Sequence, residues 1–284
     1  MIINGKEIAS KIERDLSNRA RDFEKRYGKK VTLHTILVGN DEASRIYANS
    51  KIKKLKSLGM DGYIHNLPEN SSENEIIDLL KKLSADENVH GIMVEMPLPK
   101  HLDKTKILLN IDPEKDADGQ NPLNLGLLML GNEDHVPSTP RAVIRIIEEM
   151  GIDLKGKRVC IINRTPVVGK PLAMLFLNRD ATVKICHSKT LNIENETRDS
   201  DIIVVAVGKP FFLKENMVTE KSIVIDVGIN SVENRIVGDA DFNSLKDKVS
   251  MITPVPGGVG SVTTVLIIEQ TIKNAERIME KKFM

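Results

Sequence analysis

Short, almost continuously apolar segments alternate with amphipathic segments along most of the chain, and this alternation limits the folds open to it. Five apolar segments occur in the second half, and their lack of polar alternation is typical of parallel strands covered on both faces. They are RVCIIN (158–163), ATVKICH (181–187), DIIVVAVG (201–208), SIVIDVG (222–228) and VSMITPV (249–255). A helical segment, VGKPLAMLFLN, separates the first two. The pattern predicts a doubly wound nucleotide-binding domain.

The first half shows the same alternation, with clearer helix signals. Apolar spacing predicts helices over 6–23 and 43–58, the second ending at Gly59 as a C-cap. Ser72 and Glu75 form a capping box for a third helix. The strands expected around these helices are VTLHTILVG, DGYIHNL and GIMVEMPLP. The β-α-β-α-β order predicts a second parallel sheet with right-handed crossovers.

Two further segments complete the organisation. Residues 112–140 are rich in Pro, Gly, Asp and Asn, which predicts a loop and a domain boundary. The final segment, from 261 onward, keeps Val265, Ile268 and Ile272 on one helical face. We expect a long terminal helix that returns to pack on the first domain.

Charge and cysteine usage exclude several classes of function. Lys and Arg number 41 and Asp and Glu number 40, so no global positive field exists to hold nucleic acid or an anionic membrane surface. The first residues contain no apolar signal core and no run reaches membrane-spanning length, so we expect a cytoplasmic protein. Cys160 and Cys186 lie in apolar runs without metal-type spacing and are expected to be buried and reduced. The six histidines form no metal constellation, so no metal is expected.

The segment SRIYANSK carries the first candidate chemistry. Ser44, Tyr47 and Lys51 stand at i, i+3 and i+7, on one face of the predicted second helix. An aromatic ring and an amine on one face can stack a flat ligand and move a proton. The alternative, which most Tyr and Lys pairs at this spacing represent, is ordinary surface or half-buried packing.

The segment DADG carries the second candidate for a chemical role. Asp116 and Asp118 precede Gly119 near the predicted domain boundary, and such a segment is most often a turn with solvated carboxylates. The functional alternative is one ionised acid that accepts two N–H groups from the edge of an amino-pyrimidinone ring.

A phosphate site is expected between the strand at 158–163 and the helix that follows it. Only Gly169 remains of the usual glycine fingerprint, so position in the βαβ unit carries this interpretation. The next strand ends without an Asp or Glu for a ribose diol, whereas Arg164, Thr165, Ser188 and Lys189 offer donors suited to the 2′-phosphate of NADP. An ordinary polar loop is the alternative. Farther on, TPVPGGVGSVTT would let the backbone approach a ligand, or would serve as a plain strand-to-helix hinge.

Together these segments resemble the bifunctional methylenetetrahydrofolate dehydrogenase/cyclohydrolase family over essentially the whole chain. Six motifs occur in the family's order and approximate spacing: VGNDEASRIYANSKIKKLKSLGM, GIMVEMPLP, DPEKDADGQNPLNLG, VVGKPLAMLFLNRDATVKICHSKT, IVIDVGIN and TPVPGGVGSVT. The resemblance implies an α/β protein of two three-layer domains with a cleft between them. Residues 1–138 plus 264–284 would form the folate-binding catalytic domain, and residues 139–263 the Rossmann-type NADP-binding domain. A homodimer is also implied.

The resemblance further implies residue roles. Tyr47 would stack on the folate, Lys51 would be the central catalytic group, and Asp118 would hold the pterin. The implied substrate contacts are Tyr47, Lys51, Val94, Glu95, Met96, Asp118, Pro256, Gly257, Gly258, Val259 and Gly260. The implied NADP contacts are Asn163, Arg164, Thr165, Ser188 and Ile229.

The implied reaction has two steps and belongs to one-carbon metabolism and purine biosynthesis. Hydride leaves the methylene carbon of 5,10-methylenetetrahydrofolate for NADP, which gives the 5,10-methenyl cation. Water then adds to that carbon, and ring opening gives 10-formyltetrahydrofolate. The protein mainly positions the reactants and handles protons, for which Lys51 is the candidate.

One departure from the family affects this chemistry directly. The family's Val-Gln-Leu-Pro-Leu-Pro has Gln where this chain has Glu95, and the Gln is hydrogen-bonded to the catalytic lysine. An ionised carboxylate about 4 Å away would favour the ammonium by roughly 4 kcal/mol at an effective dielectric of about 20, which would slow hydrolysis or move it in pH. A protonated Glu95 would instead offer a donor and an acceptor, as Gln does. The sequence leaves both states open, and the pair would titrate as a unit.

Other departures are milder: Asn163 replaces Gly, Thr165 replaces Ser, Ser138 replaces Cys, and Ser261 with Val262 replace Pro-Met. Three hypotheses follow. The chain is a dehydrogenase with cyclohydrolase activity, a dehydrogenase whose cyclohydrolase activity is weak or absent because of Glu95, or a non-catalytic NADP-binding regulator. Retention of Tyr47, Lys51 and Asp118 argues against the third.

Overall fold

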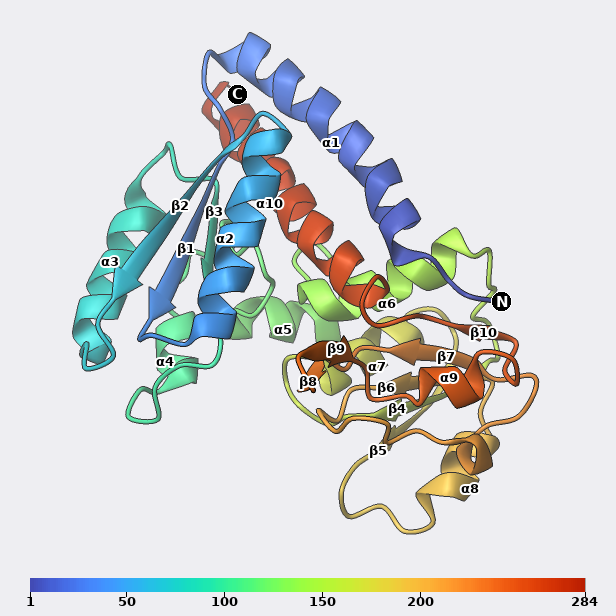
Figure 1. Ribbon diagram of the computed structural model, residues 1–284. Helices are drawn as coiled ribbons and strands as arrows, with labels where there is room; N and C mark the ends of the chain where they lie inside the picture. The colour runs from blue at the N-terminus through green and yellow to red at the C-terminus, as the bar shows by residue number, and fades with distance from the viewer. Residues whose placement is uncertain (284) are drawn as a thin grey trace. The chain divides into compact units, whose positions relative to one another are not determined.

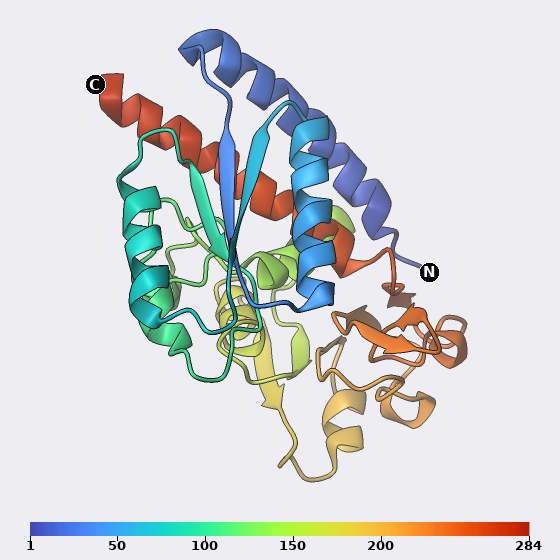
Figure 2. The same cartoon turned by 60° about the vertical axis from the view of Figure 1, so that its left-hand side comes forward.

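The computed structural model describes residues 1–283, apart from the side chains of Ala43 and Phe283 (Figures 1 and 2). Its contacts divide the chain into two compact units. Unit 1 comprises residues 1–10 and 137–263, and unit 2 comprises residues 11–136 and the chain from 264 onward. No helix in the described part of the chain is long and apolar enough to cross a membrane.

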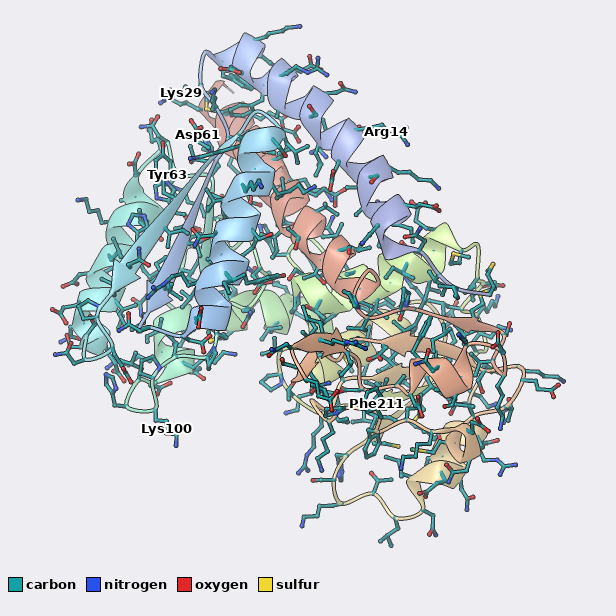
Figure 3. The ribbon with its side chains drawn as sticks, viewed as in Figure 1. Arg14, Lys29, Asp61, Tyr63, Lys100 and Phe211 are labelled. Carbon is teal, nitrogen blue, oxygen red and sulfur yellow. The ribbon has the colours of Figure 1, made fainter. Side chains whose placement is uncertain are left out.

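Unit 2 is built on a parallel sheet in the order β2-β1-β3, as the alternation predicted. The strands are β1 (Thr32–Val38), β2 (Asp61–Leu67) and β3 (Gly91–Val94). Helix α2 (Glu42–Ser57) follows β1, and α3 (Glu73–Ala85) follows β2. The predicted capping box is present at the start of α3, where Ser72 Oγ accepts from the Glu75 backbone N–H. Strand β2 lies at the edge and leaves Tyr63 48% exposed (Figure 3).

Helices cover both faces of this sheet. Alternate residues of β1 and β3, such as Ile36 and Ile92, pack in one apolar cluster with Ile76 and Leu80 of α3. On the opposite face, the position of Gly91 lies directly beneath Thr271 of α10 (Val259–Phe283). The predicted return of the terminal helix to the first sheet is therefore confirmed. Helix α1 (Gly5–Tyr27) joins the same layer, where Arg19 makes a two-pronged ion pair with Glu276.

The prediction that residues 112–140 form a loop was wrong in part. Two helices begin inside this range, α5 (Pro122–Met129) and α6 (Ser138–Glu149), after the short helix α4 (Lys104–Leu108). Asn121 caps α5 by accepting from the Leu123 backbone N–H at 2.8 Å, and Pro122 fits the first helical turn because that turn needs no N–H from it. The turn-forming composition therefore concealed a helix start.

Unit 1 contains a five-stranded parallel sheet in the order β10-β7-β6-β4-β5, which confirms the predicted doubly wound pattern. Its strands are β4 (Arg158–Ile162), β5 (Thr182–Cys186), β6 (Ile202–Val205), β7 (Ile223–Asp226) and β10 (Met251–Ile252). Besides α6, its helical segments include α7 (Gly169–Leu177), α8 (Ile193–Arg198), η1 (Glu215–Met217) and α9 (Phe242–Leu245). The antiparallel hairpin β8 (Asn230–Val232) and β9 (Arg235–Val237) was not predicted. Cys160 and Cys186 are buried free thiols.

The contact between Gly91 and Thr271 yields a stability prediction. An added Cβ at Gly91 would lie 2.8 Å from Thr271 Cγ2 and Oγ1, so Gly91→Ala should lower the free energy of unfolding by about 1–3 kcal/mol. Thr271→Ala in the same chain removes both clashing atoms and should restore much of the loss. Urea unfolding of the two single variants and the double variant measures this coupling. Additive single effects would contradict the packing of α10 on β3.

Candidate functional site

Lys51 is a lysine buried within unit 2, with only 1% of its surface exposed. Its Nζ donates to Glu95 Oε1 and lies 3.6 Å from Met93 Sδ. It also lies 4.3 Å from the centroid of the Tyr47 ring, because Tyr47 and Lys51 are four residues apart on one face of α2. The helix thus presents an aromatic ring and a buried amine side by side, as the spacing predicted.

Glu95 follows the last residue of β3 and is held by the sheet. Its backbone N–H donates to Ile36 O at 2.9 Å, and its side chain is only 6% exposed. Burial raises the pKa of the Glu95 carboxyl, the nearby Lys51 lowers it, and the charge of Asp118 raises it further. The net shift is upward. Glu95 therefore holds its proton to higher pH than an exposed glutamate does.

Tyr47 has one open side and one enclosed end. Its residue is 38% exposed, whereas its hydroxyl is enclosed and hydrogen-bonded to Thr264. Burial raises the pKa of Tyr47 to about 12, although the hydrogen bond to Thr264 acts in the opposite direction. The hydroxyl therefore stays protonated at physiological pH. The ring remains available to a flat ligand while its polar tip is fixed.

A short additional parallel pairing with β3 places Asp118 near Glu95 and Tyr47. The backbone of Ile92 accepts from Ala117 N–H at 3.0 Å and donates to Lys115 O at 2.7 Å. This parallel pairing aligns Asp116 with Ile92, so the residue two positions later lies level with the end of the strand. Asp118 accordingly lies within electrostatic reach of both Glu95 and Tyr47.

Asp116 shapes the turn that carries Asp118. It is 1% exposed and accepts from the backbone N–H groups of Gly119 and Asn121 and from Asn124 Nδ2, at 2.8 to 3.0 Å. Burial raises its pKa to about 6 despite these bonds. Of the two aspartates, one organises the turn, and Asp118 is half-buried at its edge.

The residues on either side of Glu95 are the remaining predicted substrate contacts of unit 2. Val94 is a buried residue of β3, and Met96 O accepts from Ser44 Oγ at 3.3 Å. Ser44 therefore links the start of α2 to the segment after β3. Within unit 2 the structure brings together the side chains of Tyr47, Lys51, Glu95 and Asp118. The side chains of Val94 and Met96 instead pack in the apolar cluster that includes Ile36 and α3, so only the backbone of these two residues borders the group.

The expected cofactor residues of unit 1 lie where the strand order reverses. Strand β4 has β5 on one side and β6 on the other, so the carboxyl ends of β4 and β6 flank a topological switch point. Asn163 follows β4, and its Nδ2 donates across this point to Ala206 O at 2.6 Å. Its Oδ1 accepts from Gly169 N at 3.0 Å and from the backbone and hydroxyl of Thr165, each at 2.8 Å. Asn163 thus fixes the loop between β4 and α7.

The polar residues that follow β4 and β5 fit a phosphorylated dinucleotide. The first N–H of α7 is already bound by Asn163, so a phosphate must be recognised beside it. Arg164 and Thr165 are exposed after β4, and Ser188 and Lys189 are exposed in the turn after β5. Together they form a cationic, donor-rich set without a carboxylate, which fits the 2′-phosphate of NADP.

The other predicted residues of unit 1 lie near one another in the loops after β7 and β10. Ile229 is 65% exposed, and an added Cβ at Gly260 would lie 3.8 Å from Ile229 Cδ1. Gly257 has φ +103°, a conformation that only glycine adopts readily. Pro256, Gly258 and Val259 complete this stretch at the start of α10.

Sequence reasoning missed two contributors. Gln120, which is 9% exposed, donates from Nε2 to Asp118 Oδ2. In unit 1, buried Asp239 accepts from the backbone N–H groups of residues 207–209, which fixes the loop after β6. Neither bond has a signal in local spacing, since each depends on the fold of a loop.

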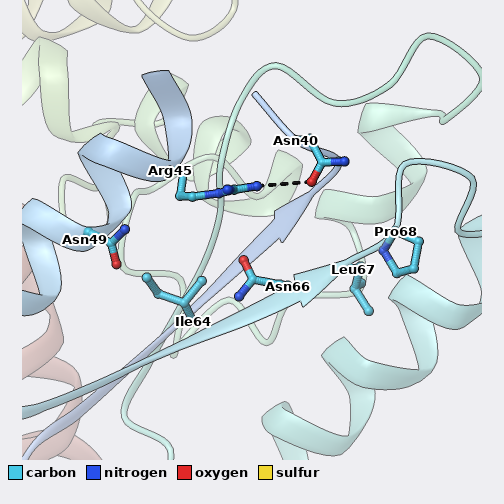
Figure 4. A pocket seen from close by; sticks show the side chains of 8 residues that line it. Asn40, Arg45, Asn49, Ile64, Asn66, Leu67 and Pro68 are labelled. Carbon is cyan, nitrogen blue, oxygen red and sulfur yellow. Dashed lines mark hydrogen bonds between the residues drawn. The ribbon is translucent and has the colours of Figure 1, made fainter. Parts of the chain in front are cut away.

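A separate hollow of about 420 Å³ lies along α2 and β2 (Figure 4). Arg45 and Asn49 line it, and Arg45 Nη2 donates to Asn40 Oδ1 at 3.0 Å. These residues occupy a different face of α2 from Tyr47 and Lys51, so the hollow is distinct from the cluster around Lys51. Among residues 1–283, no group of three or more His, Cys, Asp or Glu side chains could hold a metal ion.

Both halves of the chain match known proteins of the same family. Residues 3–118 match the family model of the tetrahydrofolate dehydrogenase/cyclohydrolase catalytic domain, and residues 137–279 match that of the tetrahydrofolate dehydrogenase/cyclohydrolase NAD(P)-binding domain. The bifunctional protein FolD of Acetivibrio thermocellus is 45% identical over 97% of this chain and 96% of its own. That of Campylobacter hominis is 46% identical over 99% of each chain.

Solved structures agree with these sequence matches. The crystal structure of the bifunctional enzyme FolD, methylenetetrahydrofolate dehydrogenase/cyclohydrolase, from Campylobacter jejuni is 41% identical, with a TM-score of 0.95 over 98% of this chain and 99% of that one. The Trypanosoma brucei methylenetetrahydrofolate dehydrogenase-cyclohydrolase, solved with NADP cofactor and an inhibitor, is 35% identical, with a TM-score of 0.94 over 98% and 97%.

The buried carboxyl of Asp116 yields a prediction for stability against pH. Its pKa is raised from 3.8 to about 6 in the folded state, so the native protein binds the proton more tightly than the unfolded chain. The contribution of about 3 kcal/mol is present below pH 4 and is lost as pH rises through 6. Asp116→Asn removes this dependence.

Urea unfolding of both proteins between pH 4 and 7 measures the difference. The stability of the unsubstituted protein relative to Asp116→Asn should fall with increasing pH. Parallel pH profiles of the two proteins would show that the Asp116 pKa is not raised.

Proposed function

The chain belongs to the tetrahydrofolate dehydrogenase/cyclohydrolase family, and we propose that Tyr47, Lys51, Glu95 and Asp118 carry its chemistry. The protein is an NADP-dependent enzyme that oxidises 5,10-methylenetetrahydrofolate to the 5,10-methenyl form and hydrolyses that product to 10-formyltetrahydrofolate. The observation that carries the residue assignment is the buried Lys51–Glu95 pair beneath an open Tyr47 ring.

Binding begins with the pterin ring. The half-buried Asp118 carboxylate accepts from N3–H and the 2-amino group of the ring, two donors whose spacing matches its two oxygens. The exposed side of Tyr47 stacks against the folate, with its hydroxyl held by Thr264. These two contacts place the one-carbon unit near Lys51 and fix its orientation.

In the oxidation step, the side chains of unit 2 position the substrate and do not take part in proton transfer. NADP, held by Arg164, Thr165 and Ser188, would supply the acceptor for the hydride, which leaves the methylene carbon with the electron pair of its C–H bond. The stacked Tyr47 ring and the Asp118 carboxylate hold the folate still during this transfer, and no protein group exchanges a proton in it.

The hydrolysis step depends on the proton held by the Lys51–Glu95 pair. Water adds to the methenyl carbon and loses one proton to Lys51, which leaves a hydroxyl on that carbon. The hydroxyl then loses its proton as its oxygen forms the formyl C=O, the C–N5 bond breaks with its electron pair going to N5, and N5 takes up that proton. An ionised Glu95 would keep the proton of Lys51 in place, whereas a neutral Glu95 would act as an amide does. The raised pKa of Glu95 supports the neutral form over a wider pH range than an exposed glutamate would have.

NADP is held by residues of unit 1. Arg164, Thr165 and Ser188 bind the 2′-phosphate as hydrogen-bond donors and positive charge. Asn163 holds the loop that presents two of them, and Ile229 offers an exposed apolar surface to the cofactor. Residues 256–260 border the folate.

Family membership also supports several coarser proposals. We retain the domain bounds expected from the sequence, 1–138 plus 264–284 and 139–263. We further propose a cytoplasmic homodimer that binds neither nucleic acid nor membranes, in keeping with 41 basic and 40 acidic residues. The second candidate function is a dehydrogenase with weak cyclohydrolase activity, which the glutamate at position 95 favours.

Separate assays of the purified protein distinguish these functions. NADPH formation from 5,10-methylenetetrahydrofolate reports oxidation, and loss of 5,10-methenyltetrahydrofolate reports hydrolysis. Lys51→Met should abolish hydrolysis because the buried proton carrier is removed, while the near-native length of the side chain preserves packing. Lys56→Met, in the last turn of α2, is the control. Unchanged hydrolysis in a folded Lys51→Met protein would remove Lys51 from the mechanism.

Glu95→Gln tests the coupling to pH. The ratio of hydrolysis rates, variant over unsubstituted protein, should be near one at low pH, where Glu95 is neutral. It should rise by about tenfold or more as the pH passes the Glu95 pKa, because the ionised carboxylate then restrains Lys51. Stopped-flow hydrolysis of 5,10-methenyltetrahydrofolate from pH 5 to 9 gives this ratio, and a constant ratio would exclude the coupling.

A further inference from the structure

Gln120 has an unusual hydrogen-bonding state for a buried amide. Its Nε2 donates to Asp118 Oδ2, and its residue is 9% exposed. Its Oε1 is buried and has no hydrogen-bond partner within the described part of the chain. Buried acceptors are nearly always bonded, so an unbonded one beside a ligand-binding carboxylate indicates a ligand contact.

The orientation of this amide is fixed by chemistry. An ionised carboxylate accepts but cannot donate, so the Gln120 amide must turn its NH₂ group toward Asp118. The carbonyl oxygen of Gln120 is attached to the same carbon as the NH₂ group, so it lies beside the hydrogen bond to Asp118. The result is a row of acceptors, the two Asp118 oxygens followed by Gln120 Oε1.

The backbone holds this row in place. Asp116 accepts from the N–H groups of Gly119 and Asn121, the residues on either side of Gln120. A further backbone bond from Gln120 itself reaches Asp116. The side chain thus extends from a turn that is tied to one buried carboxyl at three consecutive residues.

The ring bound by Asp118 has one donor more than the carboxylate can take. An amino-pyrimidinone edge presents N3–H and two hydrogens on the 2-amino group. The carboxylate accepts N3–H and one amino hydrogen, which leaves the second amino hydrogen without a partner. We propose that Gln120 Oε1 accepts this second hydrogen, and so makes the site select rings that carry a 2-amino group. The proposal rests on the folate function proposed above.

The contact between Gln120 and the amino group is tested by a double cycle, in which the ligand loses its amino group and the protein loses the Gln120 amide. The probes are 5,8-dideazafolic acid and its 2-desamino form, which differ only in the amino group, and their dissociation constants are measured by isothermal titration calorimetry. In the unsubstituted protein, loss of the amino group should weaken binding by tenfold or more. In Gln120→Leu, the same loss should have an effect about fivefold smaller, because one acceptor of the amino group is already gone.

Controls separate this contact from indirect effects. Gln120→Met repeats the test with a second apolar side chain of similar length, and both variants are checked for native circular dichroism. Asn66→Leu removes an exposed amide elsewhere in unit 2 and should leave the cycle unchanged. If Gln120 makes no contact with the amino group, removal of that group will weaken binding by the same factor in Gln120→Leu as in the unsubstituted protein, and this outcome would overturn the proposal. Failure of the unsubstituted protein to bind the amino probe at all would instead refute the folate function.

Discussion

A lysine and a glutamate buried together at the end of a parallel sheet are the constraint on which the rest of the site depends. Removing two charged groups from water is costly, and the cost is offset only when the partners are held in a fixed geometry. Lys51 and Glu95 are 1% and 6% exposed, so the surrounding elements must supply that geometry. The result is a proton carrier whose partner, Glu95, has a pKa raised by burial.

The parallel sheet supplies this geometry because it brings its carboxyl ends to one edge. Glu95 follows β3, and the pairing of residues 115–117 with Ile92 brings Asp118 to the same level. Helix α2 follows β1 and delivers Lys51 from the neighbouring strand. The same rule operates in unit 1, where Asn163 bridges the ends of β4 and β6. In each unit, polar side chains gather where parallel strands end.

Much of this organisation could be predicted from the sequence, because it follows from local patterns. The strand 61–67 and the capping box at Ser72 were found where expected. The hairpin was missed because its turn, Glu233 with Asn234, adopts positive φ at both positions without the usual Asn-Gly signal. The bonds of Asn163 to Ala206 and of Gln120 to Asp118 could not be predicted, since they depend on how loops fold in three dimensions. The partner role of Glu95 was expected from family resemblance, but its protonation depends on burial that no local pattern reveals.

The central claim is that burial keeps Glu95 protonated to higher pH than an ordinary glutamate, even with Lys51 beside it. A ¹³C NMR titration of the Glu95 side-chain carboxyl, assigned by its disappearance in Glu95→Gln, measures this most directly. A midpoint above that of an exposed glutamate, about 4.3, is predicted. A midpoint at or below that value would show that the attraction of Lys51 outweighs burial, and would contradict the claim.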